Sequence, residues 1–304
     1  MSRCQGRDSS VSGQLANVVT TTTKADNGRH DMSTFTTPNP ITATLTTAGA
    51  RVRITAGERA DTVVRVEPVD SANSKDVKVA EKTRVDFADG VLAVKTTKSG
   101  DQNGSVAITI ELPAGSGLVL NTAWTEVQAD GVLGDCEVNI GSGQVQLDRV
   151  AALRGNLGTG GLAVRHVTGS AVIEGSSADV RIGEVEGVVR YQGTTGRVWI
   201  GHARSDVDLG GSNGSFDIGR ADGGVVAKAA GCPIRIGRVT RGQVEAMNAS
   251  GGIEIGVSEG TSAEVDAKST KGLVRSTVFT QDNPEVKVYA RTRLDDIVVH
   301  RVAA

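Results

Sequence analysis

The sequence predicts an all-β protein, a parallel β-solenoid (β-helix-like) with coils of about 18 residues, preceded by a short antiparallel β unit. Three observations lead to this prediction. Only 3% of the 304 residues are aromatic, whereas glycine occurs 39 times. Short runs of alternating apolar and polar residues occupy most of the chain, and the dipeptide Ile-Gly recurs at a nearly fixed interval. Small and β-branched side chains suit pleated sheets, and a fixed period indicates stacked repeats.

The N-terminal part of the chain divides into two segments. The leading 31 residues are polar and patternless, and Met32 opens a more ordered-looking segment. Residues 1–37 are therefore expected to be a disordered extension or the result of a start codon assigned too early, with Met32 as the true start. Residues 38–120 are expected to form an antiparallel opening unit, because short alternating strands lie there between Gly, Asp and Pro turns. Within it, residues 72–83 permit one short helix.

The period becomes clear beyond residue 120. Ile-Gly occurs at Ile182, Ile200, Ile218, Ile236 and Ile255, with spacings of 18, 18, 18 and 19 residues. The series extends backwards to Val164 and Leu147. A second apolar series runs between the members of the first, at Ile140, Leu157, Ile173, Tyr191, Leu209, Ala227, Ala246 and Val265. Each period therefore holds two strands.

Two short strands cannot bury their own apolar face, but a stack of such repeats can. Residues 121–304 are accordingly predicted to be solenoid repeats, with the Ile-Gly isoleucines lining one inner wall. The strand-rich segment Val286–Val299 is expected to cap the last coil, near Val265 to Val274. An antiparallel meander is the alternative architecture. Glycine is expected at the corners of the coils, where positive φ is needed.

Composition narrows the possible partners. The net charge is −2, the pI is near 6.1, and no segment concentrates Lys and Arg, which disfavours nucleic acid. Cys4, Cys136 and Cys232 are far apart and indicate reduced thiols rather than disulfides or a zinc site. There is neither a membrane-spanning apolar run nor a signal-peptide pattern, so the sequence as given favours the cytoplasm over the cell surface.

Three motifs stand in order along the chain. The segment Ile110–Ser116 (Ile-Glu-Leu-Pro-Ala-Gly-Ser) precedes the repeats, and degenerate forms of a Ser-Gly-Asp-Val turn occur at Ser177–Val180 and Ser205–Val207. The segment Val286–Val298 is similar to an Ala-Arg-Thr-x-x-Gly-Asp-Ile ending, with Leu294-Asp295 in place of x-Gly. In these motifs the chain resembles the bacterial putative adhesin family, β-strand repeat proteins of unknown function common in actinobacteria. The resemblance covers residue 38 to the C-terminus and implies a non-catalytic β-repeat protein.

A predicted outward row supplies the candidate surface contact. The residues immediately before the Ile-Gly anchors include Arg181, Trp199, Asp217 and Arg235, and we name these four the contact row. We expect Arg181 to lie over Trp199, the one large exposed aromatic, and Asp217, Arg235 and Glu254 to form a charge ladder.

A second row lies two residues after the anchors and consists of His166, Glu184, His202, Arg220 and Arg238, which we name the histidine row. Coils about 4.8 Å apart place the two imidazoles about 10 Å from each other, too far to share one metal ion directly. We therefore expect a polar ladder in which Glu184 bonds to the rings or to Arg220. No metal and no cofactor are predicted.

The functional prediction is a non-catalytic, adhesin-like binding or scaffolding surface. A protein partner or self-association is expected, and a small-molecule ligand is disfavoured because a solenoid core of small aliphatic side chains leaves no cavity of a few hundred cubic ångströms. The alternative is a carbohydrate-active enzyme on a β-helix scaffold. Asp206 and Asp208 are its candidate carboxylates, but the outward neighbours of Asp208 are Arg190 and Val226.

Overall fold

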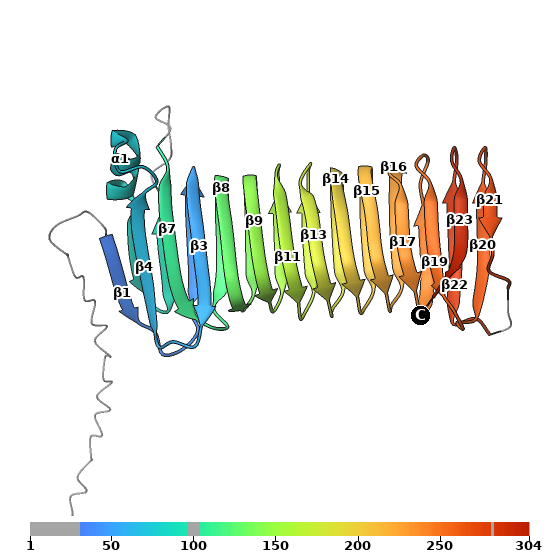
Figure 1. Ribbon diagram of the computed structural model, residues 1–304, viewed down its shortest axis with the longest axis horizontal. Coiled ribbons are helices and arrows are strands. Elements are labelled where there is room, and N and C mark those ends of the chain that lie inside the picture. The colour runs from blue at the N-terminus through green and yellow to red at the C-terminus, as the bar shows by residue number, and fades with distance from the viewer. Residues whose placement is uncertain (1–30, 97–103, 281–282, 304) are drawn as a thin grey trace, which may run out of the picture.

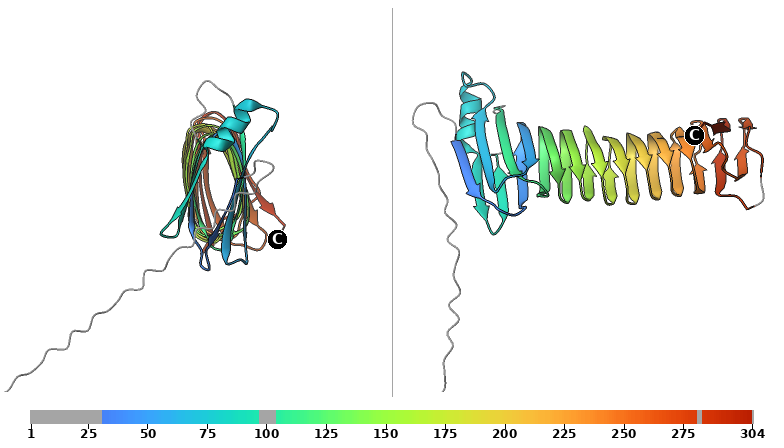
Figure 2. Two further views of the ribbon diagram at one scale, coloured as in Figure 1. Left: turned by 90° about the vertical axis from the view of Figure 1, so that its left-hand side faces the viewer. Right: turned by 60° about the horizontal axis from the view of Figure 1, so that its bottom comes forward.

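The protein is an elongated, mostly parallel all-β stack (Figure 1). The computed structural model describes residues 31–96, 104–280 and 283–303, and in these it contains 23 strands and one helix. Viewed down its long axis, the stack is a flattened loop with two strand-bearing sides (Figure 2). We call the side toward the viewer in Figure 1 the front face and the other the back face.

Among the described residues, the front face consists of 14 strands in a single row. In spatial order they are β1 (Asp31–Thr36), β4 (Asp61–Pro68), β7 (Val106–Pro113), β3 (Ala50–Gly57), the second halves of β8 (Gly117–Leu133) and β9 (Cys136–Val150), β11 (Gly161–Val167), β13 (Asp179–Val185), the second halves of β14 (Val189–Ala203) and β15 (Val207–Ala221), β17 (Ile234–Val239), β19 (Ile253–Ser258), β23 (Ile297–Val302) and β21 (Val274–Ser276).

The back face has a matching row. In spatial order it contains β5 (Arg84–Ala88), β6 (Val91–Lys95), β2 (Thr42–Ala48), the first halves of β8 and β9, β10 (Leu153–Leu157), β12 (Ala171–Gly175), the first halves of β14 and β15, β16 (Val225–Gly231), β18 (Gly242–Met247), β22 (Val286–Thr292) and β20 (Ala263–Ser269). The strands β8, β9, β14 and β15 run across both faces and join the two rows.

The front-face register confirms the first sequence series. Ile182, Ile200, Ile218, Ile236 and Ile255 pair in turn across parallel neighbours, and each has no exposed surface. The backward extension is also confirmed, because Val164 pairs with both Ile182 and Leu147. Parallel pairing rules out the antiparallel meander. The isoleucines therefore form one inner wall with successive members in adjacent coils.

The second series is confirmed in two runs that are out of register with each other: Ile140 pairs with Leu157, and a longer run follows. Ile173, Tyr191, Leu209, Ala227 and Ala246 pair in register along the back face. Towards the N-terminus the series slips by two positions, because Leu157 pairs with Gly175 rather than Ile173. At the other end Val265 pairs with Val288, whereas Ala246 pairs with Ala290. The short 16-residue step from Leu157 to Ile173 was the sign of this slip.

The Ile-Gly glycines are required by close approach between coils rather than by positive φ. A Cβ on Gly219 would lie 2.6 Å from the carbonyl oxygen of Gly201, and one on Gly201 would lie 2.5 Å from that of Gly183. Positive φ is instead found at corner glycines such as Gly214, at 122°. The prediction about corners is thus confirmed, and the repeated dipeptide has a separate cause.

The core is a continuous column of aliphatic side chains, with few aromatics, as the composition predicts. Cys136 and Cys232 are buried in it as free thiols, and burial raises their pKa to about 12 and about 11, respectively. Both thiols are therefore protonated and unreactive at neutral pH. Cys4 lies outside the described residues.

The N-terminal end differs from the predicted opening unit. Antiparallel pairing is limited, in the described ranges, to β1 with β4, β4 with β7, and β5 with β6. By contrast, β2 pairs in parallel with β6 and β8, and β3 pairs in parallel with β7 and β8. The expected helix is present as α1 (Ser74–Lys82), capped by the Asn73 side chain and packed on β4 and β7. β1 falls in the expected extension 1–37, of which residues 1–30 lie outside the described residues.

The expected C-terminal cap is wrong. The strands β22 and β23 contain the segment expected to cap the stack, but they lie inside it, between β18/β19 and β20/β21. The terminal coil is therefore the earlier segment, β20 with β21 (Figure 1). Within the residues that the structure describes, no helix combines the length and apolar character that a bilayer crossing requires.

Candidate functional site

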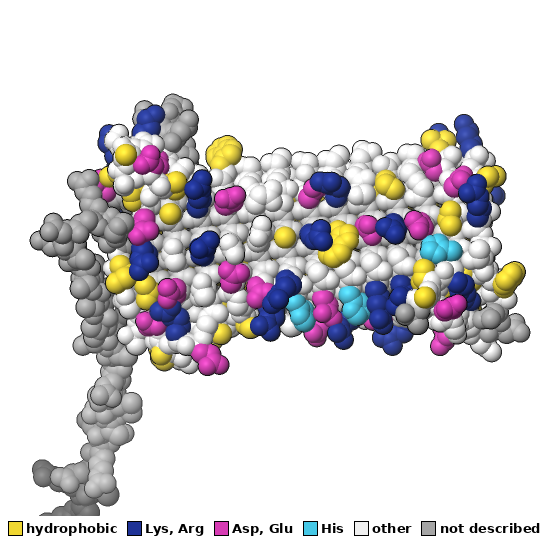
Figure 3. Space-filling view, viewed as in Figure 1, with side chains coloured by type: hydrophobic (Ala, Val, Ile, Leu, Met, Phe, Trp, Pro, Cys, Tyr) yellow, Lys and Arg dark blue, Asp and Glu magenta, His cyan; other side chains and the backbone are white. Residues whose placement is uncertain are grey.

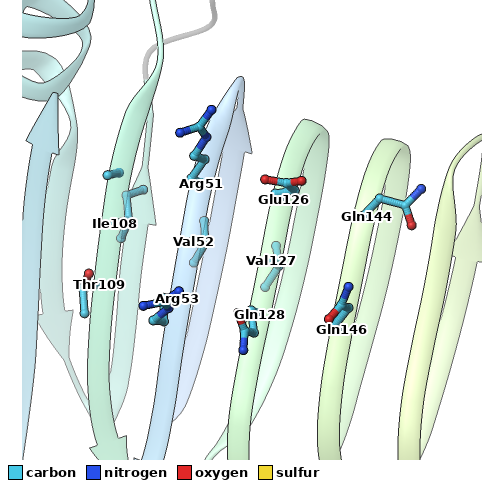
Figure 4. A pocket seen from close by; sticks show the side chains of 11 residues that line it. Arg51, Val52, Arg53, Ile108, Thr109, Glu126, Val127, Gln128, Gln144 and Gln146 are labelled. Atoms are coloured by element: carbon cyan, nitrogen blue, oxygen red, sulfur yellow. The ribbon is translucent and has the colours of Figure 1, made fainter. Parts of the chain in front are cut away.

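A shallow trough runs along the front face. It consists of two adjoining hollows of about 450 and 410 Å³, which share Gln144 and Gln146 in their linings. The first hollow extends to Arg51 and Arg53 on β3 (Figure 4), and the second extends to Trp199 on β14. We call the two together the front trough. Both hollows are depressions of the surface and open to solvent, whereas the expectation from the sequence concerned cavities in the core.

The front trough follows from strand geometry. Side chains alternate across a strand, so two outward positions flank each inward one. Parallel stacking in register aligns these positions into rows, one containing Glu126 and Gln144 and the other containing Gln128 and Gln146. Buried residues such as Val127 lie between the rows and form the floor. The trough is thus the space between two side-chain rows.

The contact row forms as predicted. Arg181 lies over the Trp199 ring, with its guanidinium carbon 4.1 Å from the ring centroid. Arg235 Nη1 lies 4.0 Å from Asp217 Oδ2, and Arg235 Nε lies 3.5 Å from Glu254 Oε2. Three of the four residues, Arg181, Trp199 and Asp217, line the front trough. Arg235 lies on the next strand, outside its lining.

The exposure of Trp199 corrects one expectation. Its ring is only partly exposed, because Arg181 covers one side and the ring packs close to the backbone of Gly201. The large exposed aromatics are Trp124, at 73%, and Phe279, at 82%. The Trp199 ring therefore lines the trough as a packed side chain and does not protrude into solvent.

The histidine row is an ion ladder that runs along one margin of the front face, where charged and His side chains gather (Figure 3). Its partners differ in part from those expected. Glu184 accepts from Arg204 Nε at 2.6 Å and lies 3.6 Å from His202 Nδ1, while His166 Nε2 lies 3.0 Å from Glu186. The expected bond from Glu184 to Arg220 is replaced, because Arg220 donates to Asp222 at 2.8 Å.

Asp222 is the most heavily bonded carboxylate of this ladder. Partial burial acts to raise its pKa, but hydrogen bonds from Arg220, His202 and Thr240 outweigh that effect and hold the pKa at about 2. The Arg204 guanidinium likewise holds the pKa of Glu184 below its usual range. Both carboxylates are ionised at neutral pH and are already engaged within the ladder.

The β3 end of the front trough carries two arginines and one carboxylate, since Glu126 lies opposite Arg51 on the neighbouring strand. Arg51 and Arg53 both point outward from β3 (Figure 4), and no ion pair within the described part of the chain involves either of them. The sequence analysis missed them. Continuing the contact row backwards by 17 or 18 residues reaches Gln146 and Gln128, but Arg53 lies 75 residues before Gln128 in the chain and beside it in space.

Asp206 and Asp208, the candidate carboxylates of the enzymatic alternative, have different surroundings. Asp206 Oδ1 accepts from the Gly224 backbone N–H at 2.8 Å and holds a corner between coils. Asp208 is exposed and lies between Arg190 and Val226 on neighbouring strands, as predicted. Among the described residues no cluster of three or more His, Cys, Asp or Glu side chains is arranged to hold a metal ion.

The chain belongs to the Toastrack DUF4097 family, whose model matches residues 42–297. This agrees with the resemblance to bacterial putative adhesins. No curated protein matches the chain.

Solved structures from bacteria are similar at low identity. A putative adhesin from Parabacteroides merdae is 12% identical, with a TM-score of 0.36, and the match covers 91% of this chain and 97% of that one. One from Bacteroides fragilis is 11% identical, with a TM-score of 0.30 and coverages of 90% and 97%. A putative cell adhesion protein from Clostridium sporogenes is 10% identical, with a TM-score of 0.22 and coverages of 90% and 100%. Scores of this size carry no argument about ligands or partners.

Proposed function

We propose that this protein is a non-catalytic parallel β-solenoid with about 18 residues per coil, which serves as an adhesin-like binding or scaffolding surface, and that its front trough binds an extended segment of a protein partner. The supporting observation is the alignment of outward side chains into rows that flank one continuous floor. The trough crosses the strands from β7 to β15. At about 4.8 Å per strand this is a length of about 34 Å, which fits about ten residues of extended chain.

The chemistry of the two ends suggests the partner's side chains. Arg51 and Arg53 favour a carboxylate at the β3 end, since neither has an ion-pair partner among the described residues. At the other end, the Trp199 ring with Arg181 above it offers an apolar wall beside a cation. Gln128, Gln144 and Gln146 between these ends can bond to a peptide backbone through both donor and acceptor atoms.

Site-specific photo-crosslinking in the native host tests this proposal. A photoreactive residue at Gln146 should capture one partner, and Arg53→Glu or Trp199→Ala should each lower the yield at least about fivefold, as expected for contacts that supply much of the binding energy. The matched control is Arg190→Glu, which reverses an exposed arginine on the back face and should leave the yield unchanged. Equal yields in all variants would contradict binding in the trough.

The alternative is a carbohydrate-active enzyme on the same scaffold, with Asp208 as its exposed carboxylate. Incubation with a broad glycan panel, followed by mass spectrometry of the products, separates the two functions. We expect no cleavage. Cleavage that Asp208→Asn abolishes would establish catalysis and overturn the proposed non-catalytic role. The cytoplasmic location stays a prediction, which fractionation of the native host tests.

A further inference from the structure

The terminal coil at the C-terminal end of the stack has an open edge. In the described ranges, β20 pairs only with β22 and β21 pairs only with β23. The outer sides of both strands therefore present backbone N–H and C=O groups without strand partners, which is a template for adding another strand. Figure 1 shows these two strands as the last of the stack.

This end is also less well covered than the rest of the stack. Val265 and Ala267 face the inside of the coil but are only partly buried, because no further coil lies above them. Leu273 and Val274 are 59% and 43% exposed. At the other end, α1 covers part of the stack. Terminal repeats normally need a polar cover, so an apolar end that is only partly covered indicates a contact surface.

We propose that β20 pairs with β20 of a second copy of this chain, antiparallel about a two-fold axis that passes through Asp266. In this register Glu264 faces Lys268 of the second copy, and symmetry repeats the pair. On the inner side, Val265 faces Ala267 of the second copy, again twice. The alternation of exposed Glu264, Asp266 and Lys268 with inward Val265 and Ala267 makes both sets of pairs possible at once.

The central residue of the strand tolerates this symmetry. Asp266 would face its own copy, but its carboxylate already accepts from Arg291 Nη2 at 2.7 Å, and Arg291 Nη1 donates to the Asp266 carbonyl at 2.7 Å. The repulsion between the two carboxylates is therefore offset on each side.

The neighbouring registers are worse. Centring the axis on Val265 sets Glu264 against Asp266, which are like charges. Centring it on Ala267 pairs Asp266 with Lys268 but sets Val265 against Ser269, so the two Val265–Ala267 pairs are lost. Registers in between would set inward side chains against outward ones. The contact lies on the back face, away from the front trough, so its test is independent of the proposed function.

Charge reversal at the two paired positions tests the proposal on the full chain. Sedimentation equilibrium should show a monomer–dimer equilibrium that weakens with added salt. Glu264→Lys and Lys268→Glu should each lower the association constant at least about fivefold, because each puts two like-charge pairs into the dimer. An equimolar mixture of the two variants should recover the association, since Lys at 264 of one copy then faces Glu at 268 of the other, and the remaining pair also stays opposite in charge.

The controls are Lys78→Glu on α1 and Glu174→Lys on β12, both exposed and distant from β20, and neither should change the association constant. A protein that stays monomeric up to about 1 mM would overturn the proposal. So would an open series of oligomers, which indicates head-to-tail contact. A dimer that Lys268→Glu weakens and Glu264→Lys does not would overturn this register, because Glu264 has no charged partner in the register centred on Ala267.

Discussion

At the residue scale, Asp222 shows how side chains add to the stacking of coils. Its carboxylate accepts from His202 on the preceding coil at 2.7 Å, from Arg220 on its own coil, and from the Thr240 hydroxyl on the following coil at 2.9 Å. Beside this carboxylate, the strand β15 pairs in parallel with β14 on one side and with β17 on the other. One carboxylate thus links three successive coils at the margin of the front face.

We predict that Asp222→Asn lowers the free energy of unfolding by about 1 kcal/mol at pH 7, a value limited by solvent screening at this partly exposed site. The pKa of Asp222 is lower in the folded protein, at about 2, than its ordinary value of 3.8. Its contribution to stability is therefore complete above pH 3.8 and is lost as the pH falls toward 2. Urea denaturation of both proteins across this range should show the difference narrowing. A difference that is constant with pH would contradict the assignment.

Individual contacts could be predicted from the sequence only where both partners lie in one row. Arg181 over Trp199 was such a case, because residues 18 apart become direct neighbours. Glu184 was not, since its main partner Arg204 belongs to the adjacent coil and lies two residues beyond the row. Long side chains reach diagonally, and no periodicity states which diagonal they take.

At the scale of the strand, inward isoleucines and closely packed glycines allow neighbouring coils to stack. Ile218 lies between Ile200 and Ile236 with no exposed surface. The glycine after it allows the backbone of the next coil to approach. Every strand in the middle of the stack depends on both neighbours for its hydrogen bonds, so damage to one coil should spread.

We predict that Ile218→Asp destabilises the protein by several kcal/mol, on the order of 4, because it buries a carboxylate in the apolar column without a partner. Thermal unfolding followed by circular dichroism should show a single transition shifted to a much lower temperature. Val172→Asp is the matched control, since Val172 is 38% exposed and lies between Arg154 and Arg190 on neighbouring strands. Similar losses in the two variants would contradict the inward orientation of Ile218.

The strands themselves could be predicted better than their pairing. Alternation predicted short strands within residues 38–120, where β2, β3, β4 and β7 lie. The parallel pairing of β2 and β3 was missed, because both pair with strands that follow a long excursion through β4, α1 and β5. Alternation reports a buried face and carries no information about the direction of the neighbour.

At the scale of the whole molecule, the spatial order of the strands differs from their order in the chain at both ends of the stack. β2 and β3 lie between β6/β7 and β8, and β22 and β23 lie between β18/β19 and β20/β21. The sequence suggested instead that coils follow chain order. Removing residues 286–304 would therefore take a coil out of the interior rather than uncover an edge. Spatial order at the ends is a long-range property, which local patterns do not record.

The alignment of side chains in register is the central claim, because the front trough and the ladders all depend on it. Pulsed electron–electron double resonance measures the distance between two spin labels, and so tests this alignment directly. Gln128 and Asp217 are five register steps apart along the front face, and Gln128 and Arg235 are six steps apart. At about 4.8 Å per step, we predict mean label separations near 24 and 29 Å, increasing by one strand spacing. Separations that do not increase by about one strand spacing between these two pairs would contradict the stack.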